Sequence, residues 1–549
     1  MRNRVSRENF SRRSAFGCAD FQDHSIEPPH GETIKSRVGK ECPQLPAKEM
    51  RLMLVIISDL HLSDGSFGNS VAPGAFQMFA GRLADMTRRA SWRADGEYRP
   101  IERIDLVLLG DVLDITRSAR WLDSEVRPWH DASSSPVYEA VSDITDRILR
   151  HNSTSLRILR ALASEGAIRI PANGNASQVG NSSIPVPVRI HYMVGNHDWQ
   201  LHLRGVHYDM VRQKVAHHMG LANNHTEPFA HDPLESDELL DTLRRHRVIC
   251  RHGDIFDPLA YAEDRDLASL SDGLIIELMI RFERQVRESF GDDLPELIMK
   301  GLTAMDKLRP LVLIPVWIEG LMERANPSPH QRRRIKQIWD QLVDEFLALP
   351  LVRERDSWSP FDLVDGLESA LKFSKRLSVG WMTRTMNWMN ELRGGEGPSY
   401  YGRARSEPDF RNRRARHIVY GHTHQFETIP LDASYADQFV LNQLYFNAGT
   451  WQRVYHPTVA SPGEHEFIPA ESLSYLSFFQ GDERGGRPYE TWSGNLGINP
   501  LEDVDREAGS NTAQHAHSQS ISTPGMPAMG RPHFATDSAG RHSHTSPTH

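Results

Sequence analysis

The stretch "IHYMVGNHDW" at residues 190–199 joins an apolar run to a glycine and then to three adjacent polar side chains. Asn196, His197 and Asp198 would each cost roughly 1–3 kcal/mol if they were buried without partners. Gly, Asn and Asp are also ordinary turn residues, so this stretch alone is compatible with a surface loop. The rest of the chain decides between a loop and a binding site.

Four other apolar runs also end at polar side chains. They are "LMLVIIS" (52–58) before Asp59, "IDLVLLG" (104–110) before Asp111, "HRVICR" (246–251) before His252, and "HIVYG" (417–421) before His422. Their lengths and branched side chains favour buried strands. Helical spacing of apolar residues over 75–91 and 137–165 predicts an α/β fold with helices on both sheet faces. In such folds, ligands bind beyond the carboxyl ends of the strands.

Two of these polar clusters contain pairs of residues separated by one position. The pairs are Asp59 with His61, and His422 with His424. In extended backbone, residues i and i+2 project to the same face, so each pair is expected to point into one cavity. Carboxylates, imidazoles and one amide oxygen are typical ligands of Mn, Fe or Zn ions. Cys250, two residues before His252, is interpreted as a small buried residue.

The polar blocks resemble those of the calcineurin-like metallophosphoesterase family. In chain order they are "DLH" at 59, "GDVLD" at 110, "GNHD" at 195, "RHGD" at 251 and "GHTH" at 421. Any one block is a weak signal, whereas all five in order after apolar runs are a strong one. The resemblance covers roughly 52–255 and 416–455. It implies a two-sheet sandwich flanked by helices.

Carried over residue by residue, the resemblance implies two divalent cations (Mn, Fe or Zn) that share one carboxylate. The first ion would be held by Asp59, His61, Asp111 and His424, and the second by Asp111, Asn196, His252 and His422. Ions bridged in this way lie ~3.5–4 Å apart and promote in-line displacement at phosphorus by a shared water. The expected function is hydrolysis of a phosphomonoester, phosphodiester or pyrophosphate bond.

The resemblance also assigns two catalytic residues. His197 is expected to be the general acid, and Asp114, the second Asp of "GDVLD", is expected to orient it through its other ring nitrogen. Asp198 is interpreted as a loop-bonding residue and Asp254 as a structural one. Asn447, in "LYFNAGTW" (444–451), is expected to shape a turn.

Outside the blocks, the sequence predicts a large insertion and two tails. Residues 51–255 and 416–495 are assigned to the metallophosphoesterase-like domain, and 256–415 to a helical cap with helices over roughly 264–290, 294–325, 329–348 and 361–393. Residues 1–50 and 496–549 are predicted to be disordered, with Met50 or Met53 as an alternative start.

The cap contains one unusually apolar segment, "LVLIPVWIEGLM" at 311–322. We interpret it as a face that packs against the domain. The alternatives are a lipid-bearing substrate or a peripheral contact with a bilayer.

Composition narrows the class of partner. The 549 residues carry a net charge of -9, and 39% of them are hydrophobic and 25% charged, which is typical of a globular protein. The acidic balance disfavours nucleic acid as a partner. Three cysteines without close spacing argue against a disulfide framework, and no apolar run reaches the ~18 residues of a membrane span. A cytoplasmic location is therefore expected.

Comparison with two branches of the family narrows the class of substrate that is expected. The "HGD" block and the helical insertion are similar to UDP-2,3-diacylglucosamine hydrolases, although those enzymes are shorter and have Arg in place of His197. Phosphoprotein phosphatases carry Arg-Gly where this chain has Ile115 and Thr116. The expected substrate is a phosphorylated small molecule or a lipid-linked compound. The alternative function is a non-catalytic, metal-bound scaffold that docks a partner through the helical insertion.

Overall fold

The computed structural model describes residues 50–174, 183–355, 363–372, 400–436, 439–457 and 467–495. The predicted N-terminal arm before Met50, the C-terminal tail and the segment 373–393 of the last predicted helix lie outside these residues. The described chain is a mixed α/β protein, which confirms the fold class predicted from the sequence.

Five strands form the first sheet in the order β13-β12-β1-β2-β5. Three of them, β1, β2 and β5, run parallel to one another, and β12 and β13 extend the sheet in antiparallel pairing. The strands are β1 Leu52–Ile57, β2 Arg103–Leu109, β5 Val188–Met193, β12 Ser472–Phe479 and β13 Tyr489–Asn495.

Four strands form the second sheet in the order β6-β7-β9-β8. Its strands are β6 Val248–Cys250, β7 His417–Tyr420, β8 Phe426–Ala436 and β9 Phe439–Ala448. Here β6, β7 and β9 are parallel, and β8 is antiparallel to β9. Two short pairs lie apart from both sheets: β3 Arg169–Pro171 with β4 Ser183–Pro185, and β10 Val454–Pro457 with β11 Phe467–Ala470.

The strand β1 explains why these segments read as continuous apolar runs. Met53, Val55 and Ile57 on one face join the core beneath the helices, whereas Leu54 and Ile56 on the other face join a core shared with the second sheet. Burying each such side chain contributes roughly 1.5–3 kcal/mol. Because both faces are buried, a slip of one residue would exchange the two faces, and packing therefore fixes the register.

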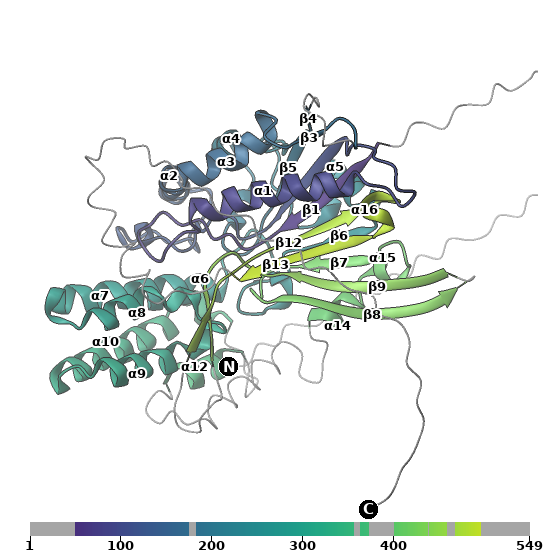
Figure 1. The fold of residues 1–549 in the computed structure, drawn as a ribbon. Helices are drawn as coiled ribbons and strands as arrows, with labels where there is room; N and C mark the ends of the chain where they lie inside the picture. Colours follow the sequence, from purple (N-terminus) through teal and green to yellow (C-terminus); the bar gives the residue numbers. More distant parts are fainter. Residues whose placement is uncertain are drawn as a thin grey trace, which may run out of the picture. The chain divides into compact units, whose positions relative to one another are not determined.

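Helices cover the outer face of the first sheet (Figure 1). These are α1 Pro73–Ala90, α2 Ser135–His151, α3 Ser153–Ser164 and α4 Val206–Met219. The helical pattern at 137–165 corresponds to two helices that are divided at Asn152, whose side chain donates to the carbonyls of Ser63 and Ile148. The remaining helices of the core are α5 Asp237–Arg245 and α16 Glu483–Gly486.

The chain between His252 and His422 is largely helical where the structure describes it. Its helices are α6 Leu270–Gly273, α7 Arg281–Phe290, α8 Glu296–Thr303, α9 Ile314–Ala325, α10 Pro329–Leu347, α11 Pro350–Arg353, α12 Leu363–Lys372, α14 Tyr400–Ala404 and α15 Pro408–Arg411. A π-helix, Leu274–Ile280, connects α6 to α7. Helices α7 to α10 run alongside one another (Figure 1).

The apolar segment at 311–322 lies in the core of this insertion. Ile314, Trp317 and Leu321 are buried there; the Trp317 ring donates to the Gly301 carbonyl of α8 and packs on Tyr455 of β10 and Phe467 of β11. The segment is thus a packed face, as expected, although most of its buried neighbours belong to the insertion itself rather than to the domain. Among the described residues, no helix combines the length and the apolar character needed to cross a bilayer.

Candidate metal centre

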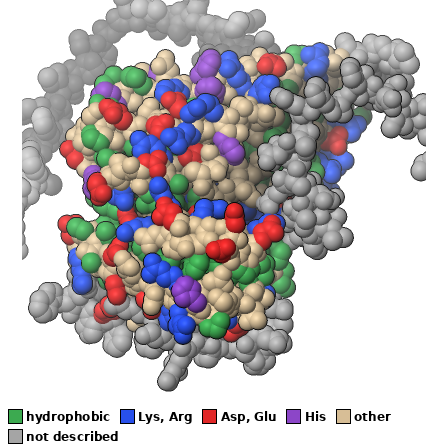
Figure 2. Space-filling model, turned by 90° about the vertical axis from the view of Figure 1, so that its left-hand side faces the viewer, with side chains coloured by type: hydrophobic (Ala, Val, Ile, Leu, Met, Phe, Trp, Pro, Cys, Tyr) green, Lys and Arg blue, Asp and Glu red, His purple; other side chains and the backbone are tan. Residues whose placement is uncertain are grey.

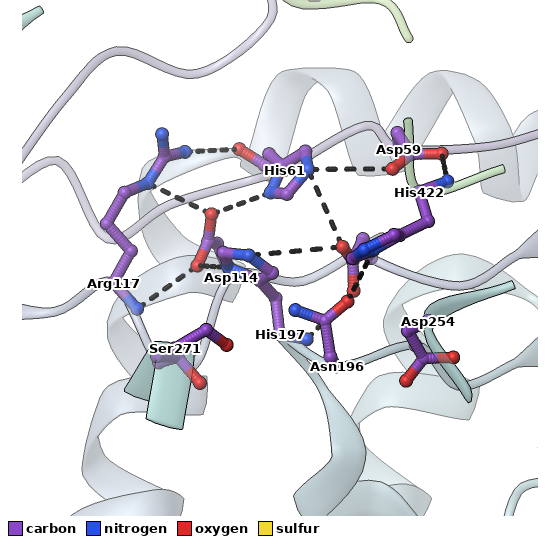
Figure 3. Close-up of polar contacts among 12 residues, drawn as sticks. Asp59, His61, Asp114, Arg117, Asn196, His197, Asp254, Ser271 and His422 are labelled. Carbon is purple, nitrogen blue, oxygen red and sulfur yellow. Dashed lines mark hydrogen bonds and ion pairs between the residues drawn. The ribbon is translucent and has the colours of Figure 1, made fainter. Parts of the chain in front are cut away.

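Nine polar side chains singled out in the sequence come together where five strands end. They follow β1, β2, β5, β6 and β7, and each contacts at least one of the others. Figure 3 labels Asp59, His61, Asp114, Asn196, His197 and His422 among them. We call this set the candidate metal centre: Asp59, His61, Asp111, Asp114, Asn196, His197, His252, His422 and His424. Except for the half-buried His422, all are buried.

The backbone at this centre is not extended, and the prediction of extended backbone around the two spaced pairs is wrong. The φ angles are 55° at Asp59, 44° at His61, 50° at Asp111, 67° at His422 and 60° at His424. Such left-handed conformations cost non-glycine residues of order 1–3 kcal/mol each and persist only where the surroundings impose them. As a result, His422 and His424 point to different partners.

Two glycines allow the loops to approach closely. A Cβ atom at Gly195 would lie 2.7 Å from a ring carbon of His252 and 2.8 Å from the backbone nitrogen of Asp111. At Gly421 it would lie 2.6 Å from a carboxylate oxygen of Asp59. Side chains of any other type would therefore push the loops apart, which explains the glycines in "GNHD" and "GHTH".

Asp59, His61 and His424 form the first ligand group. The two Nε2 atoms of His61 and His424 lie 3.0 Å apart, and Oδ1 of Asp59 lies 3.3 Å from His424 Nε2 and 3.8 Å from His61 Nε2. All three donor atoms face one another in a buried space.

The second ligand group contains Asp111, His252, His422 and Asn196. Oδ2 of Asp111 lies 3.1 Å from Nε2 of His252, and Oδ1 of Asn196 lies 3.0 Å from Nδ1 of His422. The same oxygen of Asp111 lies 3.7 Å from Nε2 of His61 in the first group. Asp111 thus stands between the two groups.

The donor atoms fit divalent cations. His61 Nδ1 lies 2.8 Å from Asp114, and His252 Nδ1 donates at 2.9 Å to the Leu109 carbonyl, so in neutral rings both Nε2 atoms present lone pairs to the centre. Metal-binding histidines are oriented in this way. Asp59 Oδ1 and His252 Nε2 are shielded from solvent without a hydrogen-bond partner among the described residues. A cation would satisfy both atoms, so the buried groups could hold metal ions.

Charges within the centre stabilise its carboxylates. Burial alone would raise the pKa of Asp111, but the charges of His252 and His197 hold that pKa well below its usual range. Burial alone would lower the pKa of His61, but hydrogen bonds to Asp114 and Asp59 and the charges of Asp114 and Asp111 raise it to about 9. The carboxylates are therefore ionised at neutral pH and matched to positive charge.

Asp114 connects the two histidines that the resemblance assigns to different roles. Its Oδ1 accepts from Nδ1 of His197 at 2.8 Å, and its Oδ2 accepts from Nδ1 of His61 at 2.8 Å. Figure 3 shows Asp114 between the two rings, with Arg117 on its other side. The Nε2 atom of His197 faces Oδ2 of Asp111 at 4.0 Å, toward the interior of the centre.

Two neighbouring aspartates have the structural contacts expected of them. Asp198 accepts hydrogen bonds from the backbone N–H groups of Val112 and Gly195. Asp254 forms an ion pair of 2.6 Å with Arg265, whose guanidinium also donates to the Gly195 carbonyl. Both carboxylates thereby hold the loops that carry the ligand candidates.

Asn447 and Cys250 also fit their structural interpretations. The side chain of Asn447 donates to the Gly421 carbonyl and accepts from the Gly449 N–H, which shapes the turn after β9. Cys250 is fully buried with its sulfur 3.7 Å from that of Met193, and burial raises the pKa of its thiol.

Two charged residues that the sequence did not single out join the insertion to this centre. Arg117 lies 2.9 Å from Asp114 and also forms an ion pair with Asp306, which belongs to the insertion. Arg117 stands three residues after Asp114, so its proximity was a usable signal. Asp306 lies in a helical region far from any block, where nothing in the sequence marks it.

Two further residues were also missed. Arg309 of the insertion places Nη2 3.0 Å from Nε2 of His424 and donates from Nη1 to the carbonyls of Asp306 and Leu308. Asp257 lies 3.1 Å from Nε2 of His422. Asp257 follows "RHGD" closely and was a visible candidate, whereas Arg309 was not.

Comparison with known proteins does not identify a family. No protein-family model matches this chain, and no curated protein matches it. The assignment of this centre therefore rests on its own residues and their geometry.

Proposed function

We propose that this chain is a metal-dependent phosphoric ester hydrolase, acting on a phosphomonoester, a phosphodiester or a pyrophosphate. The observation that supports this most directly is the position of Asp114, which accepts hydrogen bonds of 2.8 Å from both His61 and His197. The Asp114 carboxylate thus connects His61, a ligand candidate, to His197, whose ring is positioned to transfer a proton. An ion-pair cluster with only a structural role would not require the His197 ring to face the interior of the centre.

The donor set supports binding of two cations. The ligands would be Asp59, His61, Asp111 and His424 for one ion, and Asp111, Asn196, His252 and His422 for the other. Imidazole and oxygen donors without a thiolate favour Mn, Fe or Zn. When bound, such ions supply Lewis-acid polarisation of a phosphoryl group and lower the pKa of a water.

His197 is the proposed general acid. Because Asp114 accepts from Nδ1, the proton available to a substrate is the one on Nε2, which faces the centre. Protonation of the departing oxygen by a positioned side chain contributes typically about 10²–10⁴-fold to a rate. Asp114 acts as a positioning residue, since it fixes the tautomer and the direction of the ring.

Arg309 is the proposed phosphate-binding residue. Its guanidinium reaches His424 at 3.0 Å, and no carboxylate lies within ion-pair distance of it among the described residues. Arg117 differs, since Asp114 and Asp306 neutralise it. A guanidinium is well suited to phosphoryl oxygens because its N–H groups match their spacing. The insertion would thereby supply positive charge to the substrate.

The surface charge supports a small phosphorylated substrate, free or lipid-linked. Figure 2 shows one face of the molecule, on which Lys and Arg side chains are interspersed with Asp and Glu. With a net charge of -9, this pattern differs from the basic stripe of nucleic-acid-binding proteins.

The test is hydrolysis of bis(p-nitrophenyl) phosphate and p-nitrophenyl phosphate by chain loaded with Mn²⁺, Fe²⁺ or Zn²⁺. We expect activity that chelation abolishes and that re-addition of metal restores. A panel of phosphorylated metabolites and lipids then identifies the substrate class. A chain that binds the cations and hydrolyses no ester of the set would instead be a metal-bound scaffold.

A further inference from the structure

A second group of ligand-type side chains lies outside the candidate metal centre. His202 ends the 3-10 helix Trp199–His202, and Glu235 ends the 3-10 helix Pro233–Glu235 that follows His231. One donor atom of each of these three residues lies within 4.8 Å of the others. None of the nine residues of the candidate metal centre belongs to this group.

The distances suit a common cation. Oε2 of Glu235 lies 3.5 Å from Nε2 of His202, and Oε1 of Glu235 lies 2.9 Å from Nδ1 of His231. Zinc–ligand bonds of ~2.0–2.2 Å place neighbouring ligand atoms roughly 3.5 Å apart in a tetrahedral site. Small side-chain rotations are therefore sufficient to seat an ion.

His202 is held in the orientation of a metal ligand. Its Nδ1 lies 2.7 Å from Oδ1 of Asp266, so this nitrogen donates and the lone pair of the neutral ring is on Nε2, toward Glu235. A carboxylate behind a ligating histidine is the usual supporting contact in metal sites. Asp266 comes from the segment that leads into the insertion.

His231 and Glu235 form the second contact of this group. Nδ1 of His231 lies 2.9 Å from Oε1 of Glu235, which is an ion-pair distance for a protonated ring. The other oxygen of Glu235 accepts from the backbone N–H groups of His231 and Asp232 in a capping box. The capping box holds the Glu235 carboxylate beside the His231 ring, and a cation bound between Oε1 and Nδ1 would take the place of the ring proton.

We propose that His202, His231 and Glu235 form a separate site for a transition-metal cation of the zinc type, with Asp266 supporting His202. Two imidazoles and one carboxylate are a known zinc ligand set, with a fourth position open to water. A cation bound here joins the turn after β5, the loop before α5 and the start of the insertion. This site does not depend on the proposed hydrolase function.

The experiment measures zinc per chain in full-length protein after equilibrium dialysis against Zn²⁺, together with the melting temperature. His202→Ala and His231→Ala are each expected to bind one zinc ion fewer than the wild type. The matched control is His218→Ala, which removes an exposed imidazole of α4 and is expected to bind as much zinc as the wild type. Zinc should also raise the melting temperature of the wild type more than that of His231→Ala.

Two variants separate metal binding from folding. Glu235→Gln keeps an acceptor for the capping box but loses the charge, so it should fold and still lose the ion. Asp266→Asn should weaken zinc binding roughly 10–100-fold, the range for loss of a supporting contact. Equal zinc content in the wild type, His231→Ala and Glu235→Gln would overturn the proposal.

Discussion

The strand-end loops and the helical insertion contribute to the same centre in different ways. The loops place Asp59, Asp111 and His424 directly after buried strands, in left-handed backbone that the two sheets impose. The insertion contributes Asp306, from the 3-10 helix Met305–Lys307, and Arg309, which follows it. This segment is held by the bridge between Leu308 and Tyr455 of β10, and Gly68 leaves room for the Asp306 carboxylate. The ligand candidates are thus positioned by the strands that they follow, whereas the charged residues of the insertion are positioned by contacts with parts of the chain far from them in sequence.

The largest effect is expected for Asp111→Asn, which tests the contribution of the loops. The substitution preserves shape but removes the charge shared by both ligand groups. We expect kcat/KM for bis(p-nitrophenyl) phosphate to fall about 10³-fold or more, because several kcal/mol of transition-state stabilisation are lost. Asp105→Asn is the control, since Asp105 is a buried carboxylate of β2 that pairs with Arg103 away from the centre. Wild-type activity in Asp111→Asn would contradict the shared-carboxylate assignment.

His197→Ala is expected to have the next largest effect, and its size should depend on the leaving group. An alkyl phosphate ester needs a proton on its departing oxygen, so its turnover should fall about 10²–10³-fold. p-Nitrophenolate leaves readily without a proton, so its esters should lose less. The measurement is kcat for both leaving groups in wild type and variant. Equal losses for both would remove the acid role from His197.

Arg309→Gln tests the insertion directly. Loss of a charged hydrogen bond of about 1.5–3 kcal/mol should lower kcat/KM about 10–100-fold, mainly through KM, with bound metal unchanged. Arg324→Gln, at the end of α9, is a control for loss of an insertion arginine. If Arg309→Gln lowered kcat/KM as much as Asp111→Asn, the insertion would contribute as much to activity as the strand-end loops, and the proposed difference between the two regions would be wrong. An unchanged KM would exclude Arg309 from substrate binding.

The smallest expected effect is on the stability of the sheets, and it depends on the protonation of His417. His417 of β7 is packed among aromatic rings, and burial, with the charges of Arg416 and Arg247, lowers its pKa from 6.5 to about 3. The unfolded chain therefore binds a proton more readily, and stability is lost as pH falls below about 6.5. At about pH 5 this loss amounts to about 2 kcal/mol.

Replacing His417 with Phe should remove this pH dependence. Urea unfolding of wild type and His417→Phe at about pH 7 and about pH 5 measures the difference. The free energy of unfolding of the variant should change by about 2 kcal/mol less between the two conditions. The same pH dependence in both proteins would show that His417 is not the group that titrates.

Much of the centre was predictable because its residues stand where apolar runs stop. Asp59 and Asn196 each follow a buried strand, and glycines beside the ligands mark close approach. The positive φ angles were not predictable, because they result from the packing of both sheets against the loops. Arg309 carries no local signal, because its backbone is held by Tyr455 of β10 and its side chain reaches His424, both far along the chain.

The group of His202, His231 and Glu235 was also not predictable from the sequence. His231 and Glu235 stand four residues apart in one capping turn, but His202 lies about thirty residues earlier and belongs to none of the five blocks, so nothing in the sequence predicts that it meets them. Asp257 and Arg117 were within reach of a sequence argument, since each stands three residues after a block aspartate. Side chains that directly follow a strand were predictable from the sequence, whereas side chains that reach the site through contacts with a distant part of the chain were not.

The ion pair between Arg117 and Asp306 has a consequence for the modularity of this protein. A shortened chain without residues 256–415 would retain every strand-end ligand, yet Arg117 would lose Asp306 and keep its ion pair with Asp114. Removing one partner of a buried ion pair costs about 3–5 kcal/mol where the remaining charge is uncompensated, and the cost here is smaller because Asp114 remains. This loss of stability would affect the surroundings of Asp114, the carboxylate that orients His197. If this insertion were replaced by another, the new insertion would have to supply a carboxylate for Arg117, or Arg117 would have to be substituted as well.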